Sequence, residues 1–187
     1  GQGLMLVQIG QFLVDVVASF FVFILLARFH FQWLRVPFRN PIGEFMIAVT
    51  NWIVLPARRV VPPLAGLDLA TLIAAWLLQA LALTLLIAMA GGAGSTLVFV
   101  ASAFDLVRYS LYILVFAVVV QAVLSWVNPR SPVLYLFDAM TRLFLRPIRR
   151  IVPLLGNVDL SPLVLLVLLQ IALIALEHLR TAVWSML

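Results

Sequence analysis

The sequence predicts an all-α membrane protein in which about four helices cross the bilayer as two parallel repeats. Of its 187 residues, 65% are hydrophobic and only 10% are charged, and the mean hydropathy is +1.20. A soluble domain is about half apolar and a quarter charged, so most of this chain needs lipid as its solvent. Two further observations support this class: four long apolar stretches, and a sequence motif that occurs twice.

Each apolar stretch has the length of a membrane-spanning helix, which needs about 20 mostly apolar residues. The third ends near Trp126, but Asp105 and Arg108 interrupt it. Either it is one long, tilted helix, or residues 96–107 lie at the membrane surface before a span of about 109–127. The other three predicted spans are residues 12–33, 69–90 and 161–184.

The basic residues predict the orientation of these spans. All twelve are Arg, and the net charge is +5. Nine of the twelve lie in two connectors, residues 34–66 and 127–158, whereas the turn at residues 91–95 has none. Because basic residues stay in the cytoplasm, both connectors are expected there and both termini outside.

The repeated motif is the strongest sign of duplication. Residues 56–71 read PARRVVPPLAGLDLAT and residues 147–162 read PIRRIVPLLGNVDLSP, so eight of sixteen positions are identical at an offset of 91 residues. Chance would give about one identity, so we expect an internal repeat. We call these two segments elbow 1 and elbow 2.

A short amphipathic helix is predicted before each elbow, at residues 42–55 and 133–146. In both helices apolar residues recur at helical spacing along one face. The opposite, polar face contains Thr50 and Asn51 in the first helix, and Thr141 and Arg142 in the second. Such a helix is too short and too polar to span. We expect it at the cytoplasmic interface, with its apolar face in lipid or against the bundle.

The whole chain, residues 1–187, is therefore interpreted as one membrane domain. Its repeats are residues 12–90 and 103–181, each a span, an interfacial helix, an elbow and a second span. Because two spans return the chain to its starting side, the repeats are expected to be parallel and related by a pseudo-two-fold axis along the membrane normal.

This doubled pattern resembles the YggT family of bacterial integral membrane proteins, over about residues 12–176. The first copy departs at Ala70-Thr71, where the second has the more typical Ser161-Pro162. The resemblance implies a plasma-membrane location, plastid relatives, links to osmotic-stress tolerance, cell division and membrane organisation, and no established enzyme activity. The residues that carry it are Asn40-Pro41, Ser131-Pro132, the Pro-x-Arg-Arg-x-x-Pro runs, Asp68 and Asp159-Leu160-Ser161-Pro162.

The elbows provide the first candidate site. At a cytoplasmic interface their Arg pairs would fix topology and contact lipid phosphate, or else dock a partner or an anionic solute. Asp68 and Asp159 precede the second span of each repeat, so we expect them to cap those helices, with a proton relay as the alternative. The Arg side chains are expected to contact these Asp residues, lipid phosphate or nearby helix carbonyls. The Arg residues are Arg58, Arg59, Arg149 and Arg150.

Polar residues inside the spans provide the second candidate site. Three amides can join helices by hydrogen bonds, or line a path for a solute. Arg28, five residues before the end of its span, is expected to extend its side chain to the cytoplasmic surface. The amides are Gln79, Gln121 and Gln170.

The leading hypothesis is a non-enzymatic protein that scaffolds or organises the plasma membrane, and the alternative is a small transporter or channel for ions or osmolytes. The chain has no Cys, and neither His belongs to a metal-binding spacing. No catalytic residue, metal, cofactor or nucleic acid is expected. The expected partners are anionic lipid headgroups, with a second copy of the chain or another membrane protein as alternative protein partners.

Overall fold

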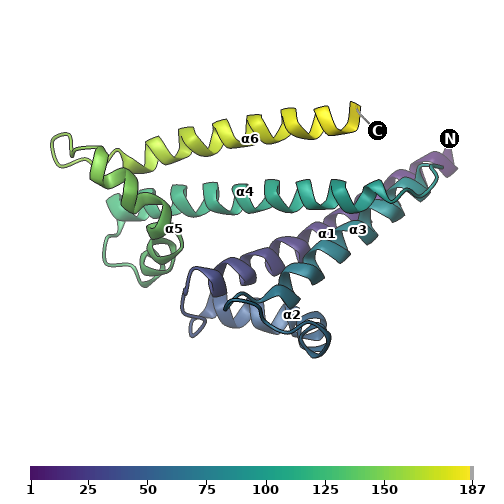
Figure 1. Ribbon diagram of the computed structural model, residues 1–187, viewed down its shortest axis with the longest axis horizontal. Helices are drawn as coiled ribbons and strands as arrows, with labels where there is room; N and C mark the ends of the chain where they lie inside the picture. Colours follow the sequence, from purple (N-terminus) through teal and green to yellow (C-terminus); the bar gives the residue numbers. More distant parts are fainter. Residues whose placement is uncertain (186–187) are drawn as a thin grey trace. The chain divides into compact units, whose positions relative to one another are not determined.

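The computed structural model describes residues 1–185, and within that range the chain folds into six helices (Figure 1). Four of them are long and apolar enough to cross a membrane, namely α1, α3, α4 and α6. This confirms the predicted all-α membrane fold. The helices are α1 (Gln2–Trp33), α2 (Pro41–Val60), α3 (Leu69–Met89), α4 (Leu97–Val127), α5 (Pro132–Ile151) and α6 (Ser161–Ser185).

The third span is one continuous helix. Helix α4 runs for 31 residues, from Leu97 to Val127, and Asp105 and Arg108 lie within it. Of the two alternatives from the sequence, the structure favours the single long helix, because residues 97–127 form one helix without a break. A charged pair can stay within an apolar helix because its two members bond to each other, as they do here.

The two short helices begin in the same way. The side chain of Asn40 accepts a hydrogen bond of 2.9 Å from the backbone N–H of Gly43, and that of Ser131 accepts one of 3.2 Å from Val133. Each cap is followed by a Pro in the first turn, where its missing N–H costs little. Similar local chemistry thus starts α2 and α5.

The ends of α2 and α5 differ from the prediction. Both helices continue through Pro56 and Pro147, and the Arg pairs form the last helical turns. Their guanidinium groups lie at the negative end of each helix dipole, which favours this arrangement. The predicted ends at residues 55 and 146 are therefore too early.

The turn in each elbow lies after the helix. Leu64 and Leu67 exchange backbone hydrogen bonds of 3.3 and 2.9 Å across Ala65 and Gly66, whose φ angles are 52° and 77°. Two central residues with positive φ are typical of a type I′ turn. Elbow 2 repeats the turn between Leu155 and Val158, where Gly156 and Asn157 have φ angles of 57° and 69°.

The chain forms two compact units, which we describe separately. Unit 1 contains residues 1–29 and 39–109, and unit 2 contains residues 30–38 and 110–185. In unit 1, α2 lies against α3, whose buried residues are mostly small and so permit close approach. In unit 2, α5 lies against α6, and Val118, Leu145 and Leu165 form a buried core.

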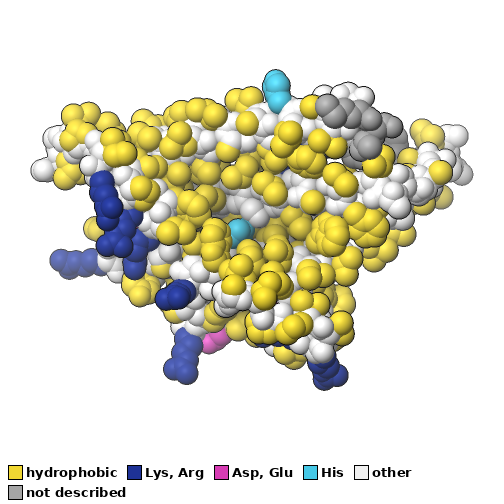
Figure 2. Space-filling model, in the orientation of Figure 1, with side chains coloured by type: hydrophobic (Ala, Val, Ile, Leu, Met, Phe, Trp, Pro, Cys, Tyr) yellow, Lys and Arg dark blue, Asp and Glu magenta, His cyan; other side chains and the backbone are white. Residues whose placement is uncertain are grey.

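The short helices α2 and α5 bury part of their polar faces. Thr50 and Thr141, expected on the polar faces of the short helices, are fully buried, whereas Phe45 and Trp52 of the apolar stripe are exposed. Each Thr hydroxyl bonds to a carbonyl of its own helix, and this satisfied hydroxyl can be buried. Large apolar side chains instead cover much of the outer surface (Figure 2).

Candidate functional site: two elbows and the polar contacts inside the spans

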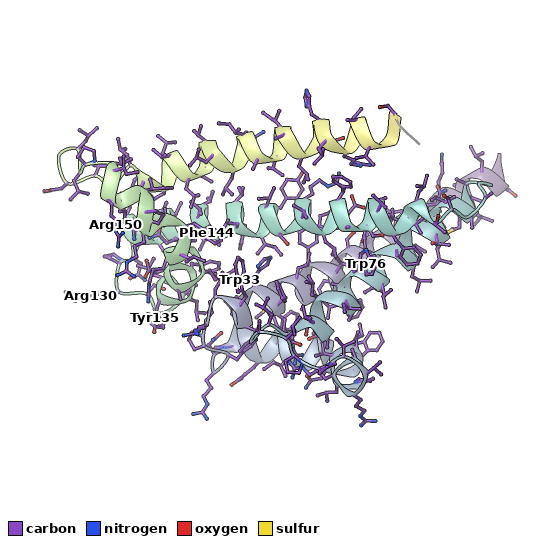
Figure 3. All side chains as sticks on the ribbon, viewed as in Figure 1. Trp33, Trp76, Arg130, Tyr135, Phe144 and Arg150 are labelled. Atoms are coloured by element: carbon purple, nitrogen blue, oxygen red, sulfur yellow. The ribbon has the colours of Figure 1, made fainter. Side chains whose placement is uncertain are left out.

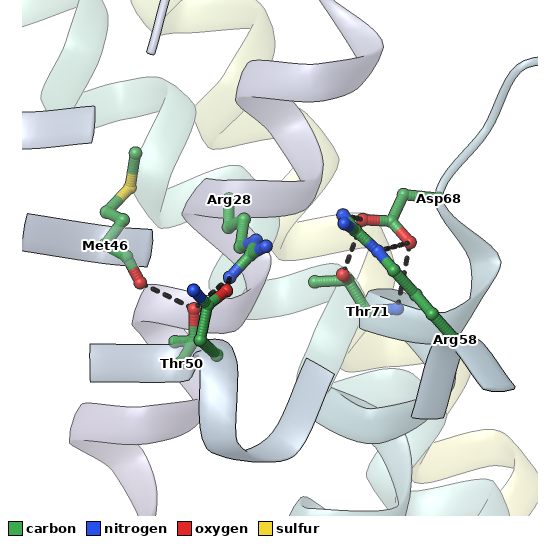
Figure 4. A network of polar contacts seen from close by, with 7 residues as sticks. Arg28, Met46, Thr50, Arg58, Asp68 and Thr71 are labelled. Atoms are coloured by element: carbon green, nitrogen blue, oxygen red, sulfur yellow. Dashed lines mark hydrogen bonds and ion pairs between the residues drawn. The ribbon is translucent and has the colours of Figure 1, made fainter. Parts of the chain in front are cut away.

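Elbow 1 contains a two-point ion pair. Nη2 of Arg58 lies 2.6 Å from Oδ2 of Asp68, and Nε of Arg58 lies 3.5 Å from Oδ1 (Figure 4). Ten residues separate the pair in sequence. The end of α2 presents the Arg, and the type I′ turn returns the chain so that Asp68 faces it.

Asp68 also caps α3, as expected. Its carboxylate accepts hydrogen bonds from the backbone N–H and the hydroxyl of Thr71, at 3.4 and 2.7 Å. Burial alone would raise the pKa of Asp68, but the hydrogen bonds from Arg58 and Thr71 and the charge of Arg58 outweigh it, so the pKa is lowered. Asp68 is therefore held as a carboxylate that joins α2 to α3.

Elbow 2 repeats the pairing in a looser form. Nε of Arg149 donates a hydrogen bond of 2.9 Å to Oδ2 of Asp159, and the backbone N–H of Ser161 donates one of 3.0 Å to Oδ1. The Asp159 side chain is 31% exposed, against 9% for Asp68. Burial acts to raise the pKa of Asp159, and the Ser161 amide and Arg149 outweigh it, so this pKa is also lowered.

The second Arg of each elbow has a different environment. Arg59 and Arg150 are exposed, and within residues 1–185 neither forms an ion pair. Arg150 lines a groove on unit 2, whereas Arg59 lines none of the cavities described here. The two Arg of a pair thus have separate roles, a distinction that the sequence did not reveal.

Arg28 does not extend to the surface as expected. It is buried, and its Nη1 donates hydrogen bonds of 2.8 Å to Oγ1 of Thr50 and 2.9 Å to Oδ1 of Asn51 (Figure 4). The prediction was wrong because α2 presents these two polar groups to α1, so the guanidinium finds partners without reaching water. Arg28 therefore joins α1 to α2.

Gln79 is part of a buried polar cluster that sequence reasoning missed. Its Nε2 donates a hydrogen bond of 2.9 Å to Oδ2 of Asp105, and Nη2 of Arg108 bonds to Oδ1 at 2.9 Å. Gln79 and Asp105 are both buried. The i, i+3 spacing of Asp105 and Arg108 within an apolar stretch was the available signal, and we had interpreted it only as an interruption of the span.

Gln121 has a different environment from Gln79. It is buried, and in the part of the chain that the structure describes its Oε1 has no hydrogen-bond partner. It lines a cavity of about 390 Å³ in unit 2, together with Ser125, Asn157, Arg149 and Asp159. Here an intramembrane amide shares a cavity with an elbow ion pair.

Gln170 has a third environment. It occupies the position of Gln79 in the second copy, but its side chain is exposed, and within residues 1–185 it forms no side-chain hydrogen bond. Within unit 2, the cavity that Gln121 lines does not include Gln170. Each of the three amides has its own surroundings, and among residues 1–185 Gln79 is the one whose hydrogen bond joins two helices.

These features define a class of protein: a multi-pass helical membrane protein built from two related halves, each closed by an Arg–Asp pair. Among residues 1–185, no group of three or more His, Asp or Glu side chains could hold a metal ion.

The chain belongs to the CCB3/YggT family, whose model matches residues 7–89 and 100–180, one segment in each repeat. The chain is 30% identical to the uncharacterised protein YggT of Escherichia coli (strain K12), over 94% of this chain and 93% of that protein. It is 31% identical to an uncharacterised protein of the proC 3′ region in Vibrio alginolyticus, over 95% and 98% of the two chains. No solved structure matches the chain.

Proposed function

We propose that this protein is a non-enzymatic, multi-pass protein of the bacterial plasma membrane that scaffolds other membrane components. One observation carries the proposal: in unit 1 the buried Arg28 and Gln79 of the spans are hydrogen-bonded to side chains of other helices. Gln79 is bonded to Asp105, and Arg28 to Thr50 and Asn51. Polar groups that are satisfied in this way stabilise helix packing and are not free to bind a passing solute.

The elbows fit the same role. Each ion pair holds the end of a short helix to the start of a span, which makes that end of the unit a fixed surface. We place this surface in the cytoplasm and both termini outside, because nine of twelve Arg lie in the connectors. Osmotic-stress tolerance or cell division would be the physiological setting, as the family resemblance implies.

A scaffold needs a face for a protein partner, and we place one on α6 at Gln170, with a second copy of the chain as the partner. An exposed amide within a span favours a polar partner over lipid. Asp15 of α1 is also exposed and lies within a span. Trp33 and Trp126 lie at the ends of the first and third spans, so each gives a reference point for depth in the membrane. Asp15 precedes Trp33 by 18 residues and Asp105 precedes Trp126 by 21, so Asp15 lies within about one helical turn of the depth at which Asp105 meets Gln79.

Cross-linking tests this partner face, because the chain has no Cys of its own. Membranes that contain both Asp15→Cys and Gln170→Cys copies should give a linked dimer on oxidation, and neither variant alone should do so. Trp52→Cys, exposed on α2, replaces Asp15→Cys in the control. Equal linking in the control and the test pair, or no linking in either, would remove the second copy as the partner.

The alternative function is a small transporter or channel for ions or osmolytes. It is favoured by Gln121, whose buried Oε1 lacks a partner and faces a cavity of about 390 Å³. Under this alternative, Gln121→Leu would abolish solute flux. Under the scaffold proposal the same change would leave assembly intact.

A further inference from the structure

A basic groove of about 570 Å³ opens on unit 2, between the connector that follows α1 and one face of α5. We call it the arginine groove. Figure 2 shows Arg side chains gathered over α5, on a surface that is otherwise mostly apolar. The groove is lined chiefly by four Arg and two aromatic residues: Arg35, Arg142, Arg146, Arg150, Trp33 and Tyr135.

Helical spacing places these side chains together. Residues 135, 139, 142, 146 and 150 follow one another by three or four positions, so they form one stripe along α5. The buried residues Leu136, Met140 and Leu145 hold the helix to the protein. The stripe is therefore a fixed surface, and Arg35 faces it from the connector.

Most of the positive charge of the groove is uncompensated. Arg142 bonds to Asp138 at 3.2 Å, whereas Arg35, Arg146 and Arg150 form no ion pair within residues 1–185. Like charges that face one groove repel each other, and a bound anion would remove that repulsion. The planar guanidinium also matches the geometry of phosphate oxygens, which it binds at two points.

The first repeat lacks this basic stripe at the equivalent positions of its short helix, as the sequence shows. At the offset of 91 residues, Tyr135 corresponds to Glu44, Arg142 to Asn51 and Arg146 to Leu55, and only Arg150 keeps an Arg, at Arg59. A basic face needed only for membrane topology would be expected on both short helices. Its restriction to α5 indicates a specific ligand.

We propose that the arginine groove binds the headgroup of an anionic phospholipid, and that its four Arg favour a headgroup with two phosphate groups over one. The inference rests on the proposed function in one respect only, that α5 lies at the membrane surface. Basic pockets beside spans bind such headgroups in other membrane proteins.

The walls of the groove favour a lipid over free phosphate. Trp33, Leu34 and Leu143 add apolar surface beside the Arg side chains, and the ring of Trp33 packs edge-on against Phe144, with ring centroids 6.3 Å apart (Figure 3). Trp and Tyr are enriched at the headgroup level of a bilayer. A lipid could place its phosphates on the guanidinium groups and its glycerol and upper acyl chain on these residues.

Lipid binding to the full chain, purified in a neutral detergent, tests the inference. The bound lipid is counted by native mass spectrometry after addition of phosphatidylcholine, phosphatidylglycerol or cardiolipin. The wild type should prefer cardiolipin. The variant Arg35→Gln/Arg146→Gln/Arg150→Gln should lose that preference by at least about tenfold, since one charge-assisted contact contributes that much.

A matched control removes the same charge elsewhere. Arg39, Arg59 and Arg130 are exposed and lie outside the groove, so changing all three to Gln should keep the preference. If the groove variant does not fold, a second variant, Arg142→Asn/Arg146→Leu, takes its place. It introduces the two residues that the first repeat has at these positions, and it should also lose the preference for cardiolipin. Equal loss in control and groove variants would overturn the inference, as would no loss in either.

Inorganic phosphate and pyrophosphate distinguish the two sources of the ligand. If the ligand is a lipid, neither of these two soluble anions should displace bound cardiolipin. Displacement by pyrophosphate, with loss in the groove variant, would assign the groove to a soluble anion and contradict the lipid. A failed lipid test would leave the cross-linking and flux results unchanged, so it is separable from failure of the proposed function.

Discussion

Gln79 in α3 donates a hydrogen bond of 2.9 Å to Asp105 in α4, inside two helices that are each long and apolar enough to cross a membrane. Arg108 bonds to the other oxygen of the same carboxylate. The buried charge is thus shared between an amide from one repeat and a guanidinium from the next. This contact links the end of the first repeat to the start of the second.

Loss of the Gln79 amide should destabilise the protein. Gln79→Leu removes one bond to a buried carboxylate, and interhelical hydrogen bonds in membranes contribute about 1 kcal/mol. Gln170→Leu is the matched control because Gln170 is exposed at the equivalent position, and its effect should be near zero or stabilising. Unfolding of both variants by denaturing detergent measures the difference, and equal losses would show that the Gln79 contact is not stabilising.

The two elbow ion pairs should differ in strength. Asp68→Ala leaves the buried Thr71 amide and hydroxyl without their acceptor, which costs about 1–3 kcal/mol. Asp159→Ala removes a more exposed pair and should cost about 0–1 kcal/mol. Thermal unfolding in detergent should therefore rank the variants in this order. Arg58→Lys should lower the stability below that of the wild type although it keeps the positive charge, since Lys cannot make the two-point contact with Asp68. The reverse ranking would mean that burial does not set the strength of the elbow.

Stability should depend on acid through Asp68. Its pKa in the folded chain is below the ordinary value of 3.8, so its contribution to folding is fully present above pH 3.8. That contribution is lost as the pH falls through the lowered pKa. Wild-type protein should therefore lose more stability below pH 3.8 than Asp68→Asn, measured as the change in melting temperature with pH. Parallel curves for the two proteins would contradict the assignment.

The orientation of the chain can be tested with single Cys residues, since none is present. A Cys at Arg59 or Arg130 in the connectors should react with a membrane-impermeant maleimide only after the cells are opened. A Cys at Ala93, in the turn between α3 and α4, should react in intact cells. The opposite pattern would invert the topology that we propose from the Arg distribution.

Much of the fold could be predicted because it depends on local and periodic signals. Apolar length predicted the four spans. The repeat of Pro, Arg and Asp predicted an Arg–Asp contact as one of three alternatives for each elbow, and the structure shows this contact for Arg58 and Arg149. The doubled motif resembles that of the YggT family, and the match of the family model to both halves confirms this resemblance. These signals need no knowledge of which helix contacts which.

The remaining features depend on contacts between segments far apart in sequence. Thr50 looked like a surface residue, but Arg28 on another helix makes its buried position favourable. Asp105 looked like a break in a span until Gln79 supplied a donor. The helical course of Pro56 could not be predicted either, because Pro ordinarily ends a helix and only the surrounding packing outweighs that preference.

Solute flux tests the central claim, that the buried polar groups inside the spans serve helix packing and do not line a path for a solute. Purified protein is reconstituted into liposomes, and efflux of ions and of small zwitterionic osmolytes is compared for wild type, Gln121→Leu and empty liposomes. Gln79→Leu serves as the variant that loosens helix packing without touching the Gln121 cavity. We predict that all four preparations leak at the same rate. Wild-type flux well above that of empty liposomes, abolished by Gln121→Leu, would contradict the account and establish a transporter.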